Sequence, residues 1–200
     1  MTQRKYLTQT EVESMLDMAK QGRYPERDYC LLYMSFIHGF RVTEVCRLRL
    51  SDLDLTHGSL YIRRMKNGFS TSHPLLRNEI RAIRAWLKVR KTMAGAESDW
   101  LFLSRLGGLL TRQRIYQIIS QLGEKANISV VSHPHMLRHA CGFALADRGV
   151  DTRLIQDYLG HRNIRHTVRY TASNAERFKD VWRLKSKRKM LHLGPNCQLL

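Results

Sequence analysis

One stretch of the 200-residue chain, residues 52–74, alternates apolar and polar side chains, whereas the segments before and after it repeat apolar residues at helical spacing. Alternation is typical of a half-buried strand, and apolar residues three and four apart are typical of an amphipathic helix. Turn signals lie within the alternating stretch at His57-Gly58 and at Asn67-Gly68, and the second favours a tight hairpin. The sequence therefore predicts a mostly α fold with a small antiparallel β-sheet (α+β).

Start and stop signals bound the expected helices. Thr8 and Glu11 form a capping box before the first helix, which Gly22 ends, and Gly39 is a natural end for the second. Pro134 suits the first turn of a later helix. The expected helices cover about residues 8–22, 27–38, 43–48, 78–91, 111–122, 135–148, 151–160, 163–170 and 175–189, with a short strand at 100–104.

The chain has a formal net charge of +17, from 34 Lys and Arg residues against 17 Asp and Glu residues. An excess of this size destabilises a compact chain by self-repulsion, and a polyanionic partner removes that repulsion. A strongly basic domain therefore favours nucleic-acid binding. The composition by itself leaves a ribosome-associated or a membrane-surface protein open.

The four cysteines are irregularly spaced and form no C-x-x-C pair, so neither a disulfide framework nor a cysteine zinc site is expected. Free thiols are typical of a reducing compartment. The first residues, MTQRKYLTQTEV, contain no apolar signal region, and no stretch approaches the roughly 20 apolar residues of a membrane span. We therefore expect a soluble, cytoplasmic, nucleoid-associated protein without a membrane partner.

Neither a phosphate-binding G-x-x-x-x-G-K-[ST] loop nor an acidic cluster suited to Mg²⁺ is present in the sequence. Asp52 and Asp54 lie two residues apart, but no other acidic residue accompanies them. A metal-dependent nuclease needs carboxylates to hold its ions. The sequence therefore predicts no cofactor and no metal, and any chemistry must depend on basic groups and a nucleophile.

The densest group of reactive side chains lies in HPHMLRH, residues 133–139. His135, Arg138 and His139 share one face of the expected helix near its N-terminus, which itself attracts anions. An arginine beside imidazoles could hold a phosphate and transfer its protons. Zinc binding by the two histidines is disfavoured, because Met136 stands where a zincin has Glu and no third ligand suggests itself. A basic helix face that touches DNA without chemistry stays open.

Three other short motifs stand out. HGFRVTE contains Arg41 and Glu44, Leu159-Gly160-His161 ends an expected helix, and Tyr170 follows nine residues after that motif's histidine. Each has a plain explanation when it is taken alone. The arginine could be a surface residue, the histidine a helix cap, and the tyrosine a packed aromatic.

Together these residues form an ordered set: Arg41, Lys66 at the expected hairpin, His135-x-x-Arg138, Leu159-Gly160-His161 and Tyr170. The set resembles the tyrosine recombinase (lambda-integrase-like) family over roughly residues 5–180. HGFRVTE, KNGFST, HPHMLRHACG and DTRLIQDYLGHRNIRHTVRYT look most like the short fimbrial phase-variation invertases of enteric bacteria. The resemblance implies the fold of the family's catalytic domain.

The resemblance also implies a DNA strand-cleavage reaction. Arg41 and Arg138 would hold the non-bridging oxygens of the scissile phosphate, whose geometry a planar guanidinium matches. Tyr170 would attack phosphorus and form a 3′-phosphotyrosyl bond. This covalent intermediate keeps the energy of the broken phosphodiester, so that rejoining needs no ATP.

The other residues of the set receive proton-transfer and supporting roles from the same resemblance. Lys66 would protonate the leaving 5′-oxygen, His135 would accept the tyrosine proton, and His161 would donate a hydrogen bond to the phosphate. Glu44 would orient the site, and His139 is a further supporting residue.

We expect a catalytic domain over residues 1–182 and a basic, apolar C-terminal tail over residues 183–200, without the N-terminal core-binding domain of most family members. The resemblance implies double-stranded DNA with inverted repeats as the substrate. It also implies a homotetrameric synapse in which neighbours exchange a C-terminal helix, and the help of DNA-bending accessory proteins.

The function that the resemblance favours is inversion of a promoter-bearing DNA segment that controls fimbrial phase variation. Two alternatives stay open. One is a catalytically silent, DNA-binding transcriptional regulator with the same fold, although all six catalytic positions are occupied. The other is a phage or island integrase, although no core-binding or arm-binding domain is recognised.

Overall fold

The computed structural model describes residues 4–64 and 69–172, and this part of the chain forms a helical domain with one small sheet. The elements, in chain order, are α1 (Gln9–Lys20), α2 (Pro25–His38), α3 (Val42–Cys46), the 3₁₀-helix η1 (Leu50–Asp52), β1 (Leu53–Asp54), β2 (Ser59–Ile62), β3 (Thr71–Pro74), α4 (Arg77–Arg90), α5 (Arg112–Lys125), α6 (Pro134–Asp147), α7 (Thr152–Leu159) and α8 (Arg165–Ala172). The predicted mostly α fold with a small antiparallel sheet is confirmed.

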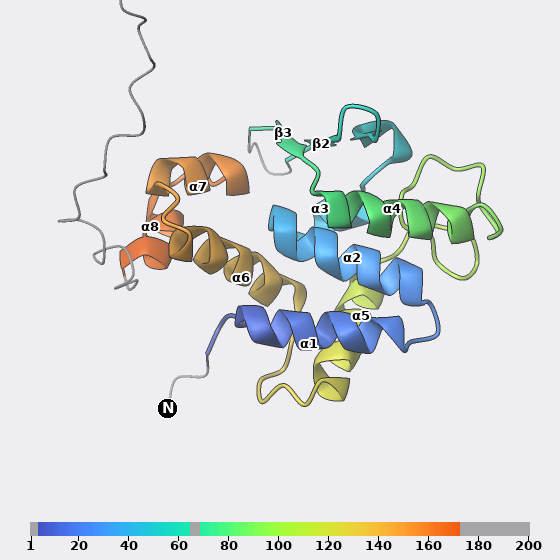
Figure 1. Ribbon diagram of the computed structural model, residues 1–200, viewed down its shortest axis with the longest axis horizontal. Helices are drawn as coiled ribbons and strands as arrows, with labels where there is room; N and C mark the ends of the chain where they lie inside the picture. The colour runs from blue at the N-terminus through green and yellow to red at the C-terminus, as the bar shows by residue number, and fades with distance from the viewer. Residues whose placement is uncertain (1–3, 65–68, 173–200) are drawn as a thin grey trace, which may run out of the picture.

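Helix α2 lies in the middle of the domain, with α1, α4 and α6 packed against it (Figure 1). Helix α5 packs against α1, α3 and α6. One large hydrophobic core joins these helices and includes the fully buried Trp86, whose Nε1 donates a hydrogen bond to Leu101 O at 2.9 Å. Tyrosine and tryptophan side chains are stable in a core when their polar atom finds such a partner.

The predicted helix signals are confirmed by the caps. Thr8 caps α1 in a two-way capping box with Glu11, and one face of α1 is buried through Val12, Met15, Leu16 and Ala19. Gly39 and Gly160 end α2 and α7 with φ of 57° and 64°. These left-handed conformations favour glycine, because a Cβ would strain the backbone there. The expected helix at residues 175–189 lies outside the described residues.

The sheet has the strand order β1-β2-β3, and both pairs are antiparallel. In β2, Leu60 and Ile62 are buried while Tyr61 is exposed, which is the alternation that the sequence predicts. The expected Asn67-Gly68 turn lies outside the described residues. β2 and β3 nevertheless pair in the register Ser59↔Pro74 to Ile62↔Thr71, so the predicted meander is confirmed.

The prediction of a strand at residues 100–104 was wrong. This segment makes only isolated bridges, Arg49↔Trp100 and Leu103↔Leu109. Leu101, Phe102 and Leu103 are buried one after another, whereas a strand at a sheet surface would bury every second residue. The segment therefore fills the core as a loop.

A second, smaller hydrophobic cluster lies where α6, α7 and α8 meet. It contains Cys141, Ile155, Leu159 and Tyr170, so the tyrosine singled out by the sequence is part of a packed core. The described cysteines, Cys30, Cys46 and Cys141, are buried free thiols. Within the described ranges, no helix is long and apolar enough to cross a membrane.

Candidate active site

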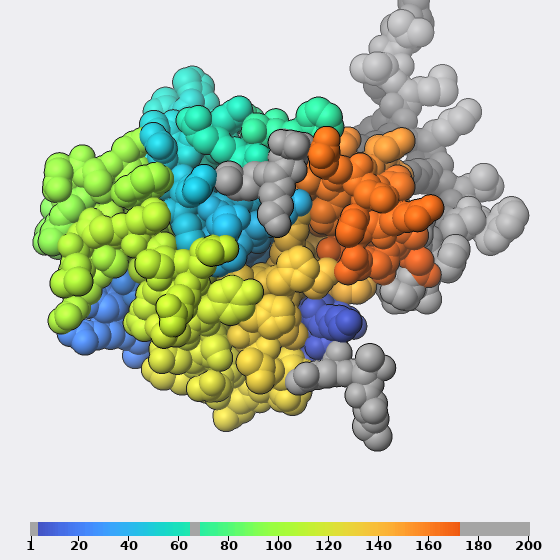
Figure 2. Space-filling model, turned by 180° about the vertical axis from the view of Figure 1, so that it is seen from behind, coloured from blue at the N-terminus to red at the C-terminus, as the bar shows by residue number. Residues whose placement is uncertain are grey.

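Seven of the eight residues singled out by the sequence lie in the described part of the chain; Lys66 lies outside it. We call the seven the catalytic cluster: Arg41, Glu44, His135, Arg138, His139, His161 and Tyr170. On the face shown in Figure 2, the light-blue segment around residues 40–50 lies next to the gold and orange segments of α6 to α8. Segments more than 100 residues apart in the sequence therefore meet on one face of the domain.

Arg138 is buried in α6 and binds the ends of two helices. Its Nη1 donates to Gly39 O at 2.5 Å and its Nη2 donates to Leu159 O at 2.6 Å. The last carbonyls of a helix have no partner within the helix and carry the negative end of its dipole, so they stabilise a cation there. The ends of α2 and α7 therefore orient this arginine.

Arg41 lies in the connection between α2 and α3. Its Nη1 donates to Glu44 Oε1 at 2.8 Å, and its Nη2 donates to Gly160 O at 3.4 Å. Glu44 Oε2 also accepts the backbone N–H of Arg41 at 2.9 Å, which closes the first turn of α3. The carboxylate thus holds both the backbone and the guanidinium of Arg41.

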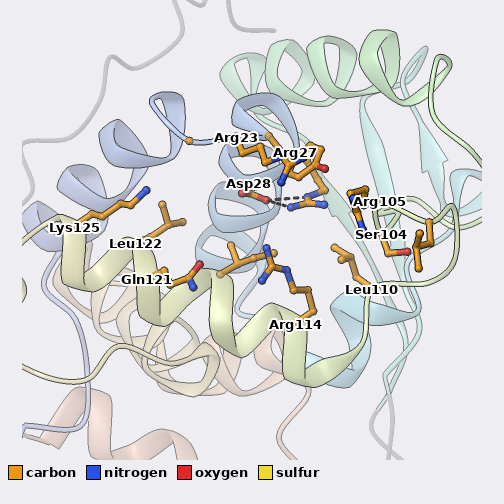
Figure 3. A pocket seen from close by; sticks show the side chains of 14 residues that line it. Arg23, Arg27, Asp28, Ser104, Arg105, Leu110, Arg114, Gln121, Leu122 and Lys125 are labelled. Atoms are coloured by element: carbon orange, nitrogen blue, oxygen red, sulfur yellow. Dashed lines mark hydrogen bonds and ion pairs between the residues drawn. The ribbon is translucent and has the colours of Figure 1, made fainter.

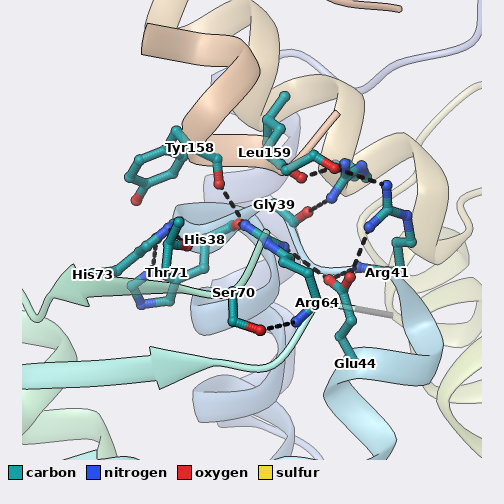
Figure 4. A network of polar contacts seen from close by, with 12 residues as sticks. His38, Gly39, Arg41, Glu44, Arg64, Ser70, Thr71, His73, Tyr158 and Leu159 are labelled. Atoms are coloured by element: carbon teal, nitrogen blue, oxygen red, sulfur yellow. Dashed lines mark hydrogen bonds and ion pairs between the residues drawn. The ribbon is translucent and has the colours of Figure 1, made fainter. Parts of the chain in front are cut away.

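A third arginine, which our reading of the sequence missed, completes this arrangement. Arg64 is buried, donates from Nη1 to Glu44 Oε2 at 2.8 Å, and donates from Nη2 to Tyr158 O at 2.5 Å (Figure 4). Arg64, Arg138 and Arg41 therefore bind three successive carbonyls at the end of α7, those of Tyr158, Leu159 and Gly160. The alternation of β2 could have indicated this, because Arg64 follows the buried Leu60 and Ile62 at the same two-residue spacing.

A buried histidine pair fixes the end of α2 from the other side. His38 Nε2 lies 2.6 Å from Glu79 Oε1, its Nδ1 lies 3.1 Å from His73 Nδ1, and both His38 and Glu79 are fully buried. Burial, followed by the charges of His38 and Arg64, lowers the pKa of His73 to about 3. The backbone that carries the carbonyls of His38 and Gly39 is therefore anchored in the core.

The three arginines give the site an excess of positive charge. Burial, followed by the charges of Arg41 and Arg64, lowers the pKa of Arg138 to about 10. Burial raises the pKa of Glu44, but the charge of Arg64 and the hydrogen bonds from Arg41 outweigh it, so the net shift is downward. Among the described residues that pair with these guanidiniums, Glu44 is the one carboxylate. The three guanidiniums exceed this carboxylate by two positive charges, and a bound phosphate would offset part of that excess.

Tyr170 lies in α8 with 1% of its surface exposed, and its hydroxyl lies 2.9 Å from His139 Nδ1. Burial is the main cause that raises the pKa of Tyr170, so the phenol is neutral at pH 7. Burial, followed by the charge of His135, lowers the pKa of His139 to about 4, so this imidazole is neutral as well. A neutral imidazole can accept a proton, and a hydroxyl that is hydrogen-bonded to it is a candidate nucleophile.

The ring of Tyr170 has room only because residue 142 is glycine. A Cβ at Gly142 would lie 2.6–2.8 Å from three carbons of the tyrosine ring. This glycine lies inside α6, where glycine is costly for a helix, and close packing explains its presence. Gly142 is a second residue that our sequence reading did not single out.

The two remaining histidines flank this pair. The ring of His135, which is exposed on α6, meets the ring of His139 edge-on at 4.4 Å. The ring of His161 stacks on that of Tyr170 at 6.3 Å, and its Nδ1 lies 2.9 Å from Thr167 Oγ1. Burial, followed by the charge of Arg138, lowers the pKa of His161 to about 3. When the Thr167 hydroxyl donates to Nδ1, the ring's proton is on Nε2, where it serves as a donor.

A basic cavity of about 400 Å³ lies apart from the catalytic cluster, between the α1–α2 connection, the turn at residues 104–106 and α5 (Figure 3). Five cationic side chains line it: Arg23, Arg27, Arg105, Arg114 and Lys125. The one acid among its lining residues, Asp28, pairs with the buried Arg27 at 2.8 Å. This surface suits additional phosphate groups, and it shares no residue with the cluster.

Comparison with known proteins agrees with this site. The phage integrase family matches residues 5–177. The chain is 59% identical over 179 residues to the type 1 fimbriae regulatory protein FimB of Escherichia coli K12, which covers 90% of both chains. It is 53% identical over 183 residues to FimE of the same strain, which covers 91% of this chain and 92% of that one.

The fold has a solved counterpart. The crystal structure of the XerA recombinase superposes with a TM-score of 0.78 at 27% sequence identity, over 94% of this chain and 68% of the other. The family match spans most of the chain and includes every residue of the catalytic cluster. The chain therefore belongs to the phage integrase family, the tyrosine recombinases, and is a site-specific DNA recombinase.

Proposed function

We propose that this recombinase inverts a promoter-bearing DNA segment between short inverted repeats and thereby switches fimbrial expression. The similarity to FimB and FimE, two fimbriae regulatory proteins, supports this outcome over that of a phage or island integrase. A catalytically silent regulator is not favoured, because Arg138 and Arg41 bind neighbouring carbonyls at the end of α7 and two histidines of the cluster contact Tyr170. The substrate is then double-stranded DNA, and the enzyme works at the nucleoid in the bacterial cytoplasm.

The observation that carries the chemical proposal is the Tyr170–His139 hydrogen bond beside the arginine group. In the cleavage step, Tyr170 Oη forms a bond to phosphorus and the bond from phosphorus to the 5′-oxygen breaks. The resemblance gives the tyrosine proton to His135; because the hydroxyl lies 2.9 Å from Nδ1 of His139, we propose His139 as the first acceptor instead. General base help of this kind typically contributes about 10²–10⁴-fold to a rate.

Arg41 and Arg138 bind the non-bridging oxygens, where negative charge builds up in the transition state. Fixed donors of this kind need no reorganisation as the charge develops. His161 Nε2 donates a further hydrogen bond to the same phosphate, and Glu44 keeps Arg41 in place. Lys66 protonates the leaving 5′-oxygen; this role rests on its position in the ordered set, since it lies outside the described residues.

The 3′-phosphotyrosyl bond keeps the energy of the phosphodiester, so the freed 5′-hydroxyl of another strand can reverse the step without ATP. Inversion requires two sites and four strand cleavages, which favours a homotetramer in the synapse. The proposal keeps residues 1–182 as the catalytic domain and residues 183–200 as a basic, apolar C-terminal tail. DNA-bending accessory proteins would bring the two sites together.

A suicide substrate tests the proposal. In a duplex that carries one inverted repeat and a nick just beyond the cleavage site, the short fragment with the freed 5′-hydroxyl diffuses away after cleavage, which traps the covalent protein–DNA adduct. We expect an adduct whose peptide map identifies Tyr170, formed equally well with EDTA and without nucleotide. An adduct at another residue, or cleavage that disappears in EDTA while DNA binding persists, would contradict the proposal. A plasmid with the two repeats in inverted orientation then tests inversion itself.

A further inference from the structure

Arg64 is the most buried charge near the catalytic cluster that the mechanism above does not use. Its side chain has 0% exposed surface, and the same is nearly true of its partner Glu44, at 1%. Removing a charge from water is costly, and such groups persist in proteins only with well-placed partners. No part of the Arg64 side chain reaches the surface, because its guanidinium is bound by Glu44 and by the ends of two helices.

The contacts of Arg64 join three elements of the site. It forms an ion pair with Glu44 of α3, donates to Tyr158 O at the end of α7, and donates to His38 O at the end of α2 at 3.5 Å (Figure 4). It also lies directly against Gly160, where a Cβ would come within 3.1 Å of its Cγ, Cδ and Nε. The turn that presents His161 therefore rests on this side chain.

Both proposed phosphate-binding arginines depend on the same three elements. Arg138 is held by Gly39 O of α2 and Leu159 O of α7, next to the carbonyls that Arg64 binds. Arg41 is held by Glu44, which it shares with Arg64, and by Gly160 O. A movement of the α7 end would therefore displace both guanidiniums, and a movement of α3 would displace that of Arg41.

We propose that Arg64 is a positioning residue of the cleavage reaction, which holds α2, α3 and α7 together so that Arg41 and Arg138 reach the scissile phosphate in the productive geometry. This inference rests on the proposed function. It adds an arginine to the ordered set from the sequence: one that acts through Glu44 and two helix ends and makes no contact with the substrate.

The expected consequence is a specific loss of charge stabilisation at the non-bridging oxygens. A misplacement of about 1 Å in a catalytic group costs on the order of 10²-fold in rate. Replacing one non-bridging oxygen by a methyl group removes the charge that the arginines stabilise. A methylphosphonate at the scissile position should therefore depend much less on their placement than a phosphodiester does.

The test compares Arg64→Met with the wild type on two suicide substrates, one with a phosphodiester and one with a methylphosphonate at the scissile position. We expect phosphodiester cleavage to fall about 100-fold, methylphosphonate cleavage to fall less than about tenfold, and binding in a gel-shift assay to be unchanged. Arg63→Met is the matched control, because Arg63 is the adjacent arginine, is 61% exposed and pairs with Asp52, outside the catalytic cluster. It should cleave both substrates like the wild type.

Equal losses on both substrates would show that Arg64 matters only for folding and would overturn the inference, as would unchanged cleavage. If Arg64→Met does not fold, Arg64→Lys serves instead, because a lysine keeps the charge near Glu44 but cannot also bind two carbonyls. Arg64→Lys should also lose more phosphodiester cleavage than methylphosphonate cleavage, but the difference between the two losses should be smaller than for Arg64→Met. Failure of the wild type to form any adduct would instead refute the proposed function, so the two failures are distinguishable.

Discussion

The hydroxyl of Tyr170 in α8 lies 2.9 Å from Nδ1 of His139 in α6, and both side chains are buried where these two helices pack together. The proposed nucleophile is thus paired with a histidine that is four residues from His135, the histidine of the His-x-x-Arg pattern. Both partners are neutral at pH 7, because burial raises the pKa of the phenol and lowers that of the imidazole to about 4.

Tyr170→Phe should abolish adduct formation while DNA binding stays close to that of the wild type. The hydroxyl carries the reaction, whereas the ring supplies the packing against Gly142 and His161. The loss of one hydrogen bond should cost about 1 kcal/mol of stability. Suicide-substrate cleavage, a gel-shift assay and a thermal melt measure the three quantities. Recombination by the Phe variant near the wild-type rate would remove the central assignment.

His139→Gln should lower the cleavage rate by about 10²–10⁴-fold, because an amide can hydrogen-bond to the hydroxyl but cannot take its proton. His135→Gln should have the smaller effect, since this ring is exposed and reaches the tyrosine only through His139. Single-turnover cleavage of the two variants compares them directly. The opposite order would assign the tyrosine proton to His135.

Arg138→Lys should reduce cleavage by orders of magnitude although the charge is kept. A lysine has no planar fork, so it cannot hold Gly39 O and Leu159 O and also a phosphate. Arg41→Lys should behave alike. Normal adduct formation by both variants would mean that the phosphate is held elsewhere.

Gly142→Ala should lower activity without preventing DNA binding. The new Cβ would lie 2.6 Å from a ring carbon of Tyr170, so the ring must move. At a solvent-exposed position inside a helix, replacing glycine by alanine increases stability, because alanine is the better helix former. Gly123→Ala is not a suitable control, because its Cβ would meet Ser132 at 2.3 Å. Cleavage by Gly142→Ala equal to that of the wild type would show that the packing is not needed.

Stability should fall as the pH is lowered from about 6.5 to about 4. Burial lowers the pKa of His73 and His161 to about 3 and that of His139 to about 4, whereas an unfolded histidine titrates near its model value of 6.5. In this window the unfolded chain binds more protons than the folded one, so acid favours unfolding. Urea denaturation at several pH values measures the effect. His139→Gln should reduce the slope of stability against pH, and an unchanged slope would contradict the shift.

The relation of Arg64 to Arg41 and Arg138 shows the limit of reading this chain as a sequence. Arg64 was recognisable as buried from the alternation of β2, because it follows Ile62 at a spacing of two. Its partners were not recognisable, because Tyr158 O lies 94 residues away in the chain and every residue carries the same carbonyl group. Only the fold decides which carbonyl an arginine meets.

The sequence by itself determined the helices with strong caps, the small antiparallel sheet, and the ordered set of residues that marks the family. These properties depend on local spacing, turn residues and side-chain chemistry, all of which are visible along the chain. The tertiary structure alone decided that residues 100–104 form a buried loop, that His139 contacts Tyr170, and that three arginines bind the end of α7. These properties depend on long-range packing, which brings together groups that no local pattern relates.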